Sequence, residues 1–121
     1  MTIANIAVLV VGCIHLGIAA AEMLLWKQPS VYGRLERLNL SADEARKVRP
    51  IVANAGLYNA FLAVGLVWSA ASHAGLFPMK LYLLACVAVA GLFGAFTLKW
   101  STLLLQTLPS LVAIWLLMTT R

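Results

Sequence analysis

Charged residues are scarce in this sequence, whose 121 residues include only four acidic and nine basic side chains, together 11% of the chain. Soluble domains average about 25% charged and about 45–50% apolar residues, whereas 63% of this chain is hydrophobic. The shortage of charge excludes an ordinary soluble domain and indicates an integral membrane protein. At this length we expect a single domain.

A basic start is also missing, because no Lys or Arg precedes the apolar run that begins at Ile3 and continues past Cys13. A secretory signal peptide begins with positive charge, so we expect no cleaved signal here. The two cysteines, Cys13 and Cys86, lie in apolar segments, where a thiol usually behaves as a small hydrophobic side chain. The aromatic residues lie in apolar runs rather than between basic residues, and no cofactor motif is present. We therefore expect neither nucleic acid nor a cofactor as a partner.

Four apolar runs are each long enough to cross a bilayer, because about 20 helical residues span the roughly 30 Å hydrocarbon core. The predicted spans cover residues 3–26, 51–71, 79–98 and 101–119. Short connections follow the second and third spans, and short connections force neighbouring helices to be antiparallel. The sequence therefore predicts an all-α integral membrane protein whose single transmembrane domain, residues 1–121, is an antiparallel four-helix bundle in the lipid bilayer.

The connection from residue 27 to 50 is the one sizeable polar segment. Its SADE stretch is typical of a capping box, in which Ser41 caps a short helix and Glu44 reaches back to the cap. That helix runs into Pro50, which fits the first turn of the second span or a bend just before it. We favour an interfacial amphipathic segment here, with a partner-binding site as the alternative.

The basic residues indicate an orientation. Six of the nine lie between Lys27 and Arg49, and Lys99 falls in the connection on the same side. Cytoplasmic loops carry an excess of Lys and Arg, and clustered cations lie well beside anionic lipid. The pattern predicts a cytoplasmic loop at 27–50 and both termini outside. The membrane we expect is a bacterial inner membrane. Trp26 and Trp100 would then mark the inner interface.

Several polar side chains fall inside the predicted spans, although a charge at the bilayer centre costs at least about 2.5–3.5 kcal/mol. At about 1.5 Å per residue, all of them lie between the inner interface and the midplane, and the outer half is almost featureless. These residues are His15, Glu22, Asn54, Tyr58, Asn59 and Gln106. They predict a polar pocket that opens toward the cytoplasm and is sealed toward the outside.

Within this pocket, His15 and Glu22 are the candidate catalytic residues, and Asn54, Tyr58, Asn59 and Gln106 are candidate substrate-binding residues. His15 and Glu22 share one face of the first span but lie about 10 Å apart along its axis, too far for shared metal ligation, so no metal is expected. Asn54 and Asn59 are separated by about 140° around the helix, so only one of them need line the pocket. Interhelical hydrogen bonding is the structural alternative for these residues.

Two stretches resemble a known family. They are H-x6-E-M-x2-W from His15 to Trp26 and AN-x-GLYN-x-FLA-x-GL-x-W from Ala53 to Trp68. Both are similar to DUF1304, a family of small bacterial and fungal integral membrane proteins known only as a domain of unknown function. The resemblance covers nearly the whole chain, and it implies four spans and a site at His15, Glu22, Asn54, Tyr58 and Asn59. The sequence departs from the family at Ala55, where members typically have Gln, and at Ile14, where many have Glu.

Three functions fit these observations. The first is binding of a small hydrophobic or amphipathic molecule, with cofactor-free acid–base chemistry on it such as isomerisation or epoxide opening. The second is a proton-coupled transporter of small molecules, although a polar lining that stops at the midplane disfavours transport. The third is a structural or assembly subunit. Small residues four apart, such as Gly17 and Ala21, allow close helix packing within one chain or in a homodimer.

Overall fold

The computed structural model describes residues 1–120, which are mostly helical and contain no β-strand. The elements in order are α1 (Ile3–Leu24), α2 (Pro29–Tyr32), α3 (Ala42–Ala71), α4 (Phe77–Thr97), the π-helix η1 (Leu103–Thr107) and α5 (Leu108–Thr119). The prediction of an all-α fold is confirmed for these residues. Helices α1, α3 and α4 are long and apolar enough to cross a membrane, and the fourth apolar helix, residues 103–119, is shorter.

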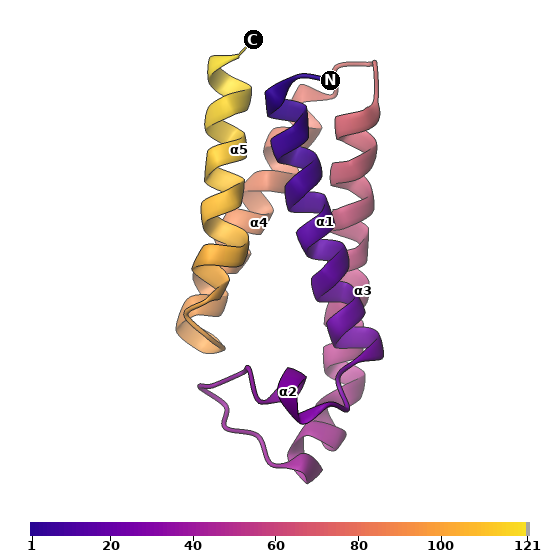
Figure 1. Ribbon diagram of the computed structural model, residues 1–121, viewed down its shortest axis with the longest axis vertical. Helices are drawn as coiled ribbons and strands as arrows, with labels where there is room; N and C mark the ends of the chain where they lie inside the picture. Colours follow the sequence, from indigo (N-terminus) through magenta and orange to yellow (C-terminus); the bar gives the residue numbers. More distant parts are fainter. Residues whose placement is uncertain (121) are drawn as a thin grey trace.

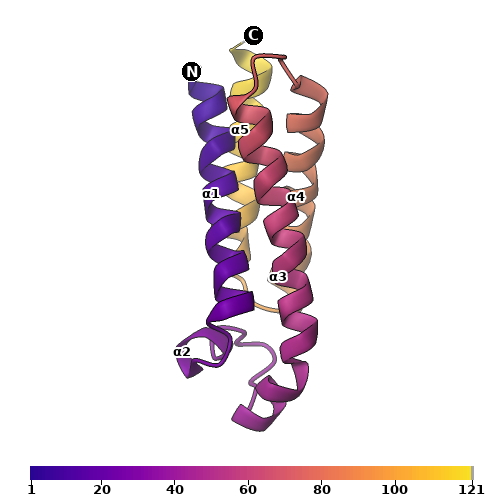
Figure 2. The same cartoon turned by 90° about the vertical axis from the view of Figure 1, so that its right-hand side faces the viewer.

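The four long helices of the fold, α1, α3, α4 and α5, lie side by side in a bundle (Figures 1 and 2). Helix α1 packs most extensively on α3 and also contacts α5, and α4 packs against η1 and α5. Both chain ends lie at one end of the bundle, and α2 lies at the other end with the connecting segment between α1 and α3 (Figure 1). This places the basic residues 27–49 at the end of the bundle away from the termini.

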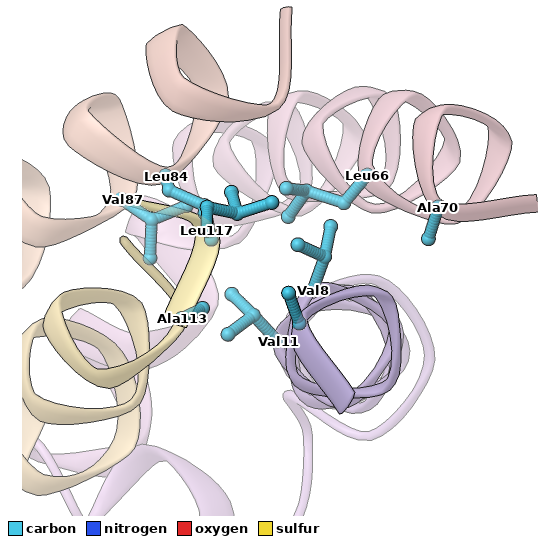
Figure 3. Packing of buried hydrophobic residues seen from close by; sticks show 9 residues of the cluster. Val8, Val11, Leu66, Ala70, Leu84, Val87, Ala113 and Leu117 are labelled. Atoms are coloured by element: carbon cyan, nitrogen blue, oxygen red, sulfur yellow. The ribbon is translucent and has the colours of Figure 1, made fainter. Parts of the chain in front are cut away.

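The buried core joins all four long helices (Figure 3). Each helix contributes small or branched apolar side chains at helical spacing, so that one stripe of each helix faces the others. The cluster contains Ala4, Val8, Val11, Leu66, Ala70, Leu84, Val87, Ala113 and Leu117. Many large apolar side chains remain exposed on the outer faces, including Phe61, Phe93 and Trp115. An outer surface of this kind is compatible with an integral membrane protein.

The predicted capping box is present at the start of α3. The Ser41 hydroxyl accepts a hydrogen bond from the Glu44 amide at 3.3 Å, and the Glu44 carboxylate accepts one from the Ser41 amide at 2.8 Å. The helix then continues through Pro50 to Ala71, so one long helix takes the place of the expected short helix and separate span. Pro50 lacks the N–H that would bond the Arg46 carbonyl. Both residues are exposed, so water can satisfy that carbonyl.

The fourth apolar helix begins with the π-helical turn η1, which ends two residues before Pro109. A proline ring disturbs the preceding helical turn because it removes a donor and clashes with the carbonyl four residues earlier. Here the amide of Leu108 bonds instead to the carbonyl of Leu103, five residues back. The hydroxyls of Thr102 and Thr107 donate to the Gly91 and Ala88 carbonyls of α4, at 2.7 and 2.9 Å. The widened turn is thereby attached to α4.

Candidate functional site

A carboxylate and an amide meet between α1 and α3. Glu22 lies in the last turn of α1, and its Oε2 accepts a hydrogen bond from Asn59 Nδ2 on α3 at 2.9 Å. Gly56 allows the two helices to approach here, because a Cβ at position 56 would lie 3.0 Å from Glu22 Cβ and 3.2 Å from the Ala19 carbonyl oxygen. The close packing of the two helices therefore positions the polar pair.

A cation lies within electrostatic reach of Glu22. Burial and the nearby Arg34 lower the pKa of Lys99, while Glu22 and Glu36 raise it. Arg34 and Glu36 are brought to this position by the connecting segment, which is attached to the end of α4. There Arg37 donates from Nε to the Ala95 carbonyl at 2.9 Å. The charge of Glu22 on α1 therefore influences the titration of Lys99 in the connection after α4.

The His15 side chain is 1% exposed in the bundle interior. Its Nδ1 lies 3.0 Å from the Val11 carbonyl oxygen and donates to it in the tautomer that carries the proton on Nδ1. In residues 1–120 no hydrogen bond joins His15 to Glu22. The histidine is therefore a second polar group deeper in the bundle, separate from the Glu22–Asn59 pair.

In residues 1–120, no hydrogen bond joins the other predicted site residues to the Glu22–Asn59 pair. Asn54 and Tyr58 are exposed on α3, and the Tyr58 ring packs edge-on against Phe61 with centroids 5.8 Å apart. Gln106 is half-buried in η1. The sequence indicated that only one asparagine of α3 need line a pocket, and the asparagine that meets Glu22 is Asn59.

Two cavities border α3, and neither has a predicted site residue in its lining. One, of about 240 Å³, is apolar and lies between α1 and α3 beside Leu16, Val67 and Trp68. The second, of about 480 Å³, lies at the start of α3 beside Trp26 and Arg49. Within residues 1–120, no group of three or more His, Cys, Asp or Glu side chains is placed to hold a metal ion.

Sequence reasoning missed two buried polar features. Lys80, predicted to lie near an end of a span, is only 5% exposed, and its Nζ donates to Asn5 Oδ1 at 2.8 Å. Asn5 and Lys80 lie near the termini, in the half that the sequence suggested was almost featureless. Asn5 and Lys80 lie at a similar depth in their predicted spans, and this similarity could have indicated that they meet. The Ser110 hydroxyl on α5 is fully buried without a hydrogen-bond partner among the described residues, and no sequence pattern indicated it.

Comparison with known proteins adds a family. The family model described as "Protein of unknown function (DUF1304)" matches residues 9–118. The chain belongs to the DUF1304 family. The matched region of this DUF1304 chain includes Glu22, Asn59 and Lys99, and the resemblance found in the sequence is confirmed. No curated protein and no solved structure matches the chain.

Proposed function

We propose that this DUF1304 protein is a four-span integral membrane protein that binds a small hydrophobic or amphipathic molecule at Glu22 and Asn59. One observation carries the proposal. A carboxylate hydrogen-bonded to an amide lies between two apolar helices, with Lys99 within electrostatic reach. Ionisable groups between apolar helices are costly, and they are usually found where a substrate or ion binds.

The membrane placement is supported by the long apolar helices and by the large apolar side chains on their outer faces. In this proposal the four long helices cross the bilayer antiparallel to one another. The basic segment 27–50 lies in the cytoplasm, since Lys and Arg favour that side. The ligand then reaches Glu22 from the cytoplasmic leaflet, because Glu22 lies in the last turn of α1, next to that segment.

The chemistry that suits these groups is cofactor-free acid–base catalysis, such as isomerisation or epoxide opening. Glu22 would exchange a proton with the bound molecule, while Asn59 orients its carboxylate through the 2.9 Å hydrogen bond. His15 lies deeper in the bundle, where its Nδ1 is beside the Val11 carbonyl. Asn54, Tyr58 and Gln106 remain predicted contacts of the ligand.

A structural role is the second candidate, and the same hydrogen bond favours it. Glu22 already has a partner on the helix that packs most closely against α1. In that case the pair would simply hold α1 and α3 together. Interhelical hydrogen bonds in membrane proteins contribute about 1 kcal/mol, so removing the carboxylate would lower stability without affecting any ligand.

Native mass spectrometry in mild detergent separates these two roles, using wild type, Glu22→Gln and the matched control Glu36→Gln. Glutamine keeps a carbonyl that can accept from Asn59, so the substitution removes charge and keeps the link between helices. We expect a discrete small molecule on wild type and on Glu36→Gln, and its loss from Glu22→Gln. Bare protein in all three samples, with equal thermal stability, would contradict ligand binding at Glu22.

A further inference from the structure

The second cavity, of about 480 Å³, is lined by residues of the connecting segment, α2 and the start of α3. These segments lie at the end of the bundle away from the termini (Figure 1). The cavity lies between the connecting segment and the first turns of α3. Aromatic, aliphatic and basic side chains share its lining, which consists of Trp26, Lys27, Pro29, Tyr32, Ala42, Ala45, Arg46 and Arg49. None of these belongs to the site proposed around Glu22.

The aromatic wall of this cavity is held in place by specific contacts. Trp26 is 4% exposed, and its Nε1 donates to the Ala45 carbonyl of α3 at 2.8 Å. The Tyr32 ring of α2 packs against it, with ring centroids 6.2 Å apart and an interplanar angle of 59°. The cavity therefore has a fixed apolar side rather than a surface of mobile side chains.

The charged side chains in the lining are all cations. Arg46 donates to the Asp43 carboxylate at 2.9 Å, and both of these side chains are exposed. Lys27 and Arg49 form no ion pair in the part of the chain that the structure describes. Glu44 lies nearby on α3, but its carboxylate is bonded to the Ser41 amide and does not line the cavity. The cavity therefore has an excess of positive charge.

The position of the cavity suggests what it binds. The inference rests on the membrane placement proposed above. A 30-residue helix is about 45 Å long, which exceeds the roughly 30 Å hydrocarbon core, so in that placement the charged first turns of α3 extend into the headgroup region. Trp and Tyr favour this depth. Lys and Arg recognise phosphate groups there, Arg through paired hydrogen bonds.

We infer that this cavity binds the phosphate headgroup of an anionic membrane lipid, with Lys27 and Arg49 on the phosphate. Trp26, Pro29 and Tyr32 contact the adjoining glycerol and first methylene groups. The lipid site is independent of the ligand at Glu22, since the two share no residue. It also gives the connecting segment a role beyond joining α1 to α3.

The test uses the purified full chain, incubated with mixed micelles of equal phosphatidylglycerol and phosphatidylcholine and examined by native mass spectrometry. The variants are Lys27→Gln, Arg49→Gln and the double variant. Lys47→Gln is the matched control, because Lys47 is exposed on the same helix and does not line the cavity. Wild type and Lys47→Gln should retain phosphatidylglycerol preferentially. Each substitution in the cavity should reduce that preference by about fivefold.

Three results would overturn the inference. The preference could be unchanged in both single variants, or Lys47→Gln could reduce it as much as they do, which would indicate diffuse charge attraction. Alternatively, millimolar inorganic phosphate could displace the bound lipid, which would make a soluble phosphate the ligand. The single variants keep the test decisive if the double variant does not fold, as judged by circular dichroism. The Glu22→Gln variant should keep its phosphatidylglycerol, which distinguishes this site from the proposed ligand site.

Discussion

Asn59 on α3 donates a hydrogen bond to the carboxylate of Glu22 on α1, across 37 residues of sequence and between the two most closely packed helices. Asn54, on the same helix, is exposed. The two asparagines can therefore be compared directly, because both lie on α3 but only Asn59 bonds to Glu22.

Asn59→Ala should lower the stability of the protein, whereas Asn54→Ala should leave it nearly unchanged. The loss should be about 1 kcal/mol, the usual size of an interhelical hydrogen bond in a membrane protein. Unfolding in detergent with increasing denaturant measures it. A double-mutant cycle with Glu22→Ala isolates the pair, and a coupling energy near zero would mean that this hydrogen bond contributes nothing to the fold.

Gly91→Ala should destabilise the contact between α4 and η1. A Cβ at position 91 would lie 2.8 Å from Gln106 Cβ and 2.8 Å from the Thr107 backbone nitrogen, and it would also collide with Thr107 Oγ1. Overpacking of this kind typically costs about 1–3 kcal/mol. Gly17→Ala is the control, because a Cβ there would have no heavy atom from elsewhere in residues 1–120 within 4 Å. Thermal unfolding should separate the two variants, and equal midpoints would show that η1 can move away from α4 at little cost.

Ser110→Ala should raise the thermal midpoint or leave it unchanged. The hydroxyl of Ser110 is buried and has no hydrogen-bond partner in the part of the chain that the structure describes, and an unsatisfied buried polar group typically costs about 1–3 kcal/mol. Ser69→Ala provides the comparison, because the equally buried Ser69 hydroxyl donates to the Leu66 carbonyl at 2.9 Å. Ser110→Ala should therefore be the more stable of the two variants. A clear loss of stability on Ser110→Ala would indicate that a bound molecule or water satisfies this hydroxyl.

The pKa of Lys99 should respond in opposite directions to two substitutions. Glu22→Gln removes an anion that favours the ammonium form, so it should lower the pKa of Lys99 further. Arg34→Gln removes a repelling cation and should raise the same pKa. An NMR titration of the protein with isotopically dimethylated lysines measures both. Identical titration curves in wild type and both variants would place Lys99 outside the range of these charges.

Local sequence signals predicted local structure well. The Ser41–Glu44 capping box needs only residues three apart, and both of its hydrogen bonds are present. Apolar runs likewise predicted the helices of the bundle, because burial or lipid contact requires them over about 20 residues. Pro50 was less informative. Proline raises the cost of a helix without forbidding it, and here the helix continues through it.

Contacts between distant segments were harder to predict. Helical periodicity separated Asn54 from Asn59, but which of them faces α1 depends on how α3 is rotated against its neighbours. The approach at Gly56 decides this, and it is set by packing rather than by periodicity. The Lys80–Asn5 hydrogen bond similarly depends on α1 and α4 meeting near the termini. The burial of Ser110 could not be predicted, because a single serine in an apolar helix can be buried or exposed without any change in the surrounding sequence pattern.

The two chain ends lie together at one end of the bundle (Figure 1). Two copies can therefore be joined head to tail by a short flexible linker and still lie next to each other with the same polarity. In a tandem of this kind both copies belong to one polypeptide, so their association no longer depends on the protein concentration. The tandem also allows Glu22→Gln to be introduced in one half only, so that the contribution of each copy to ligand binding can be counted separately.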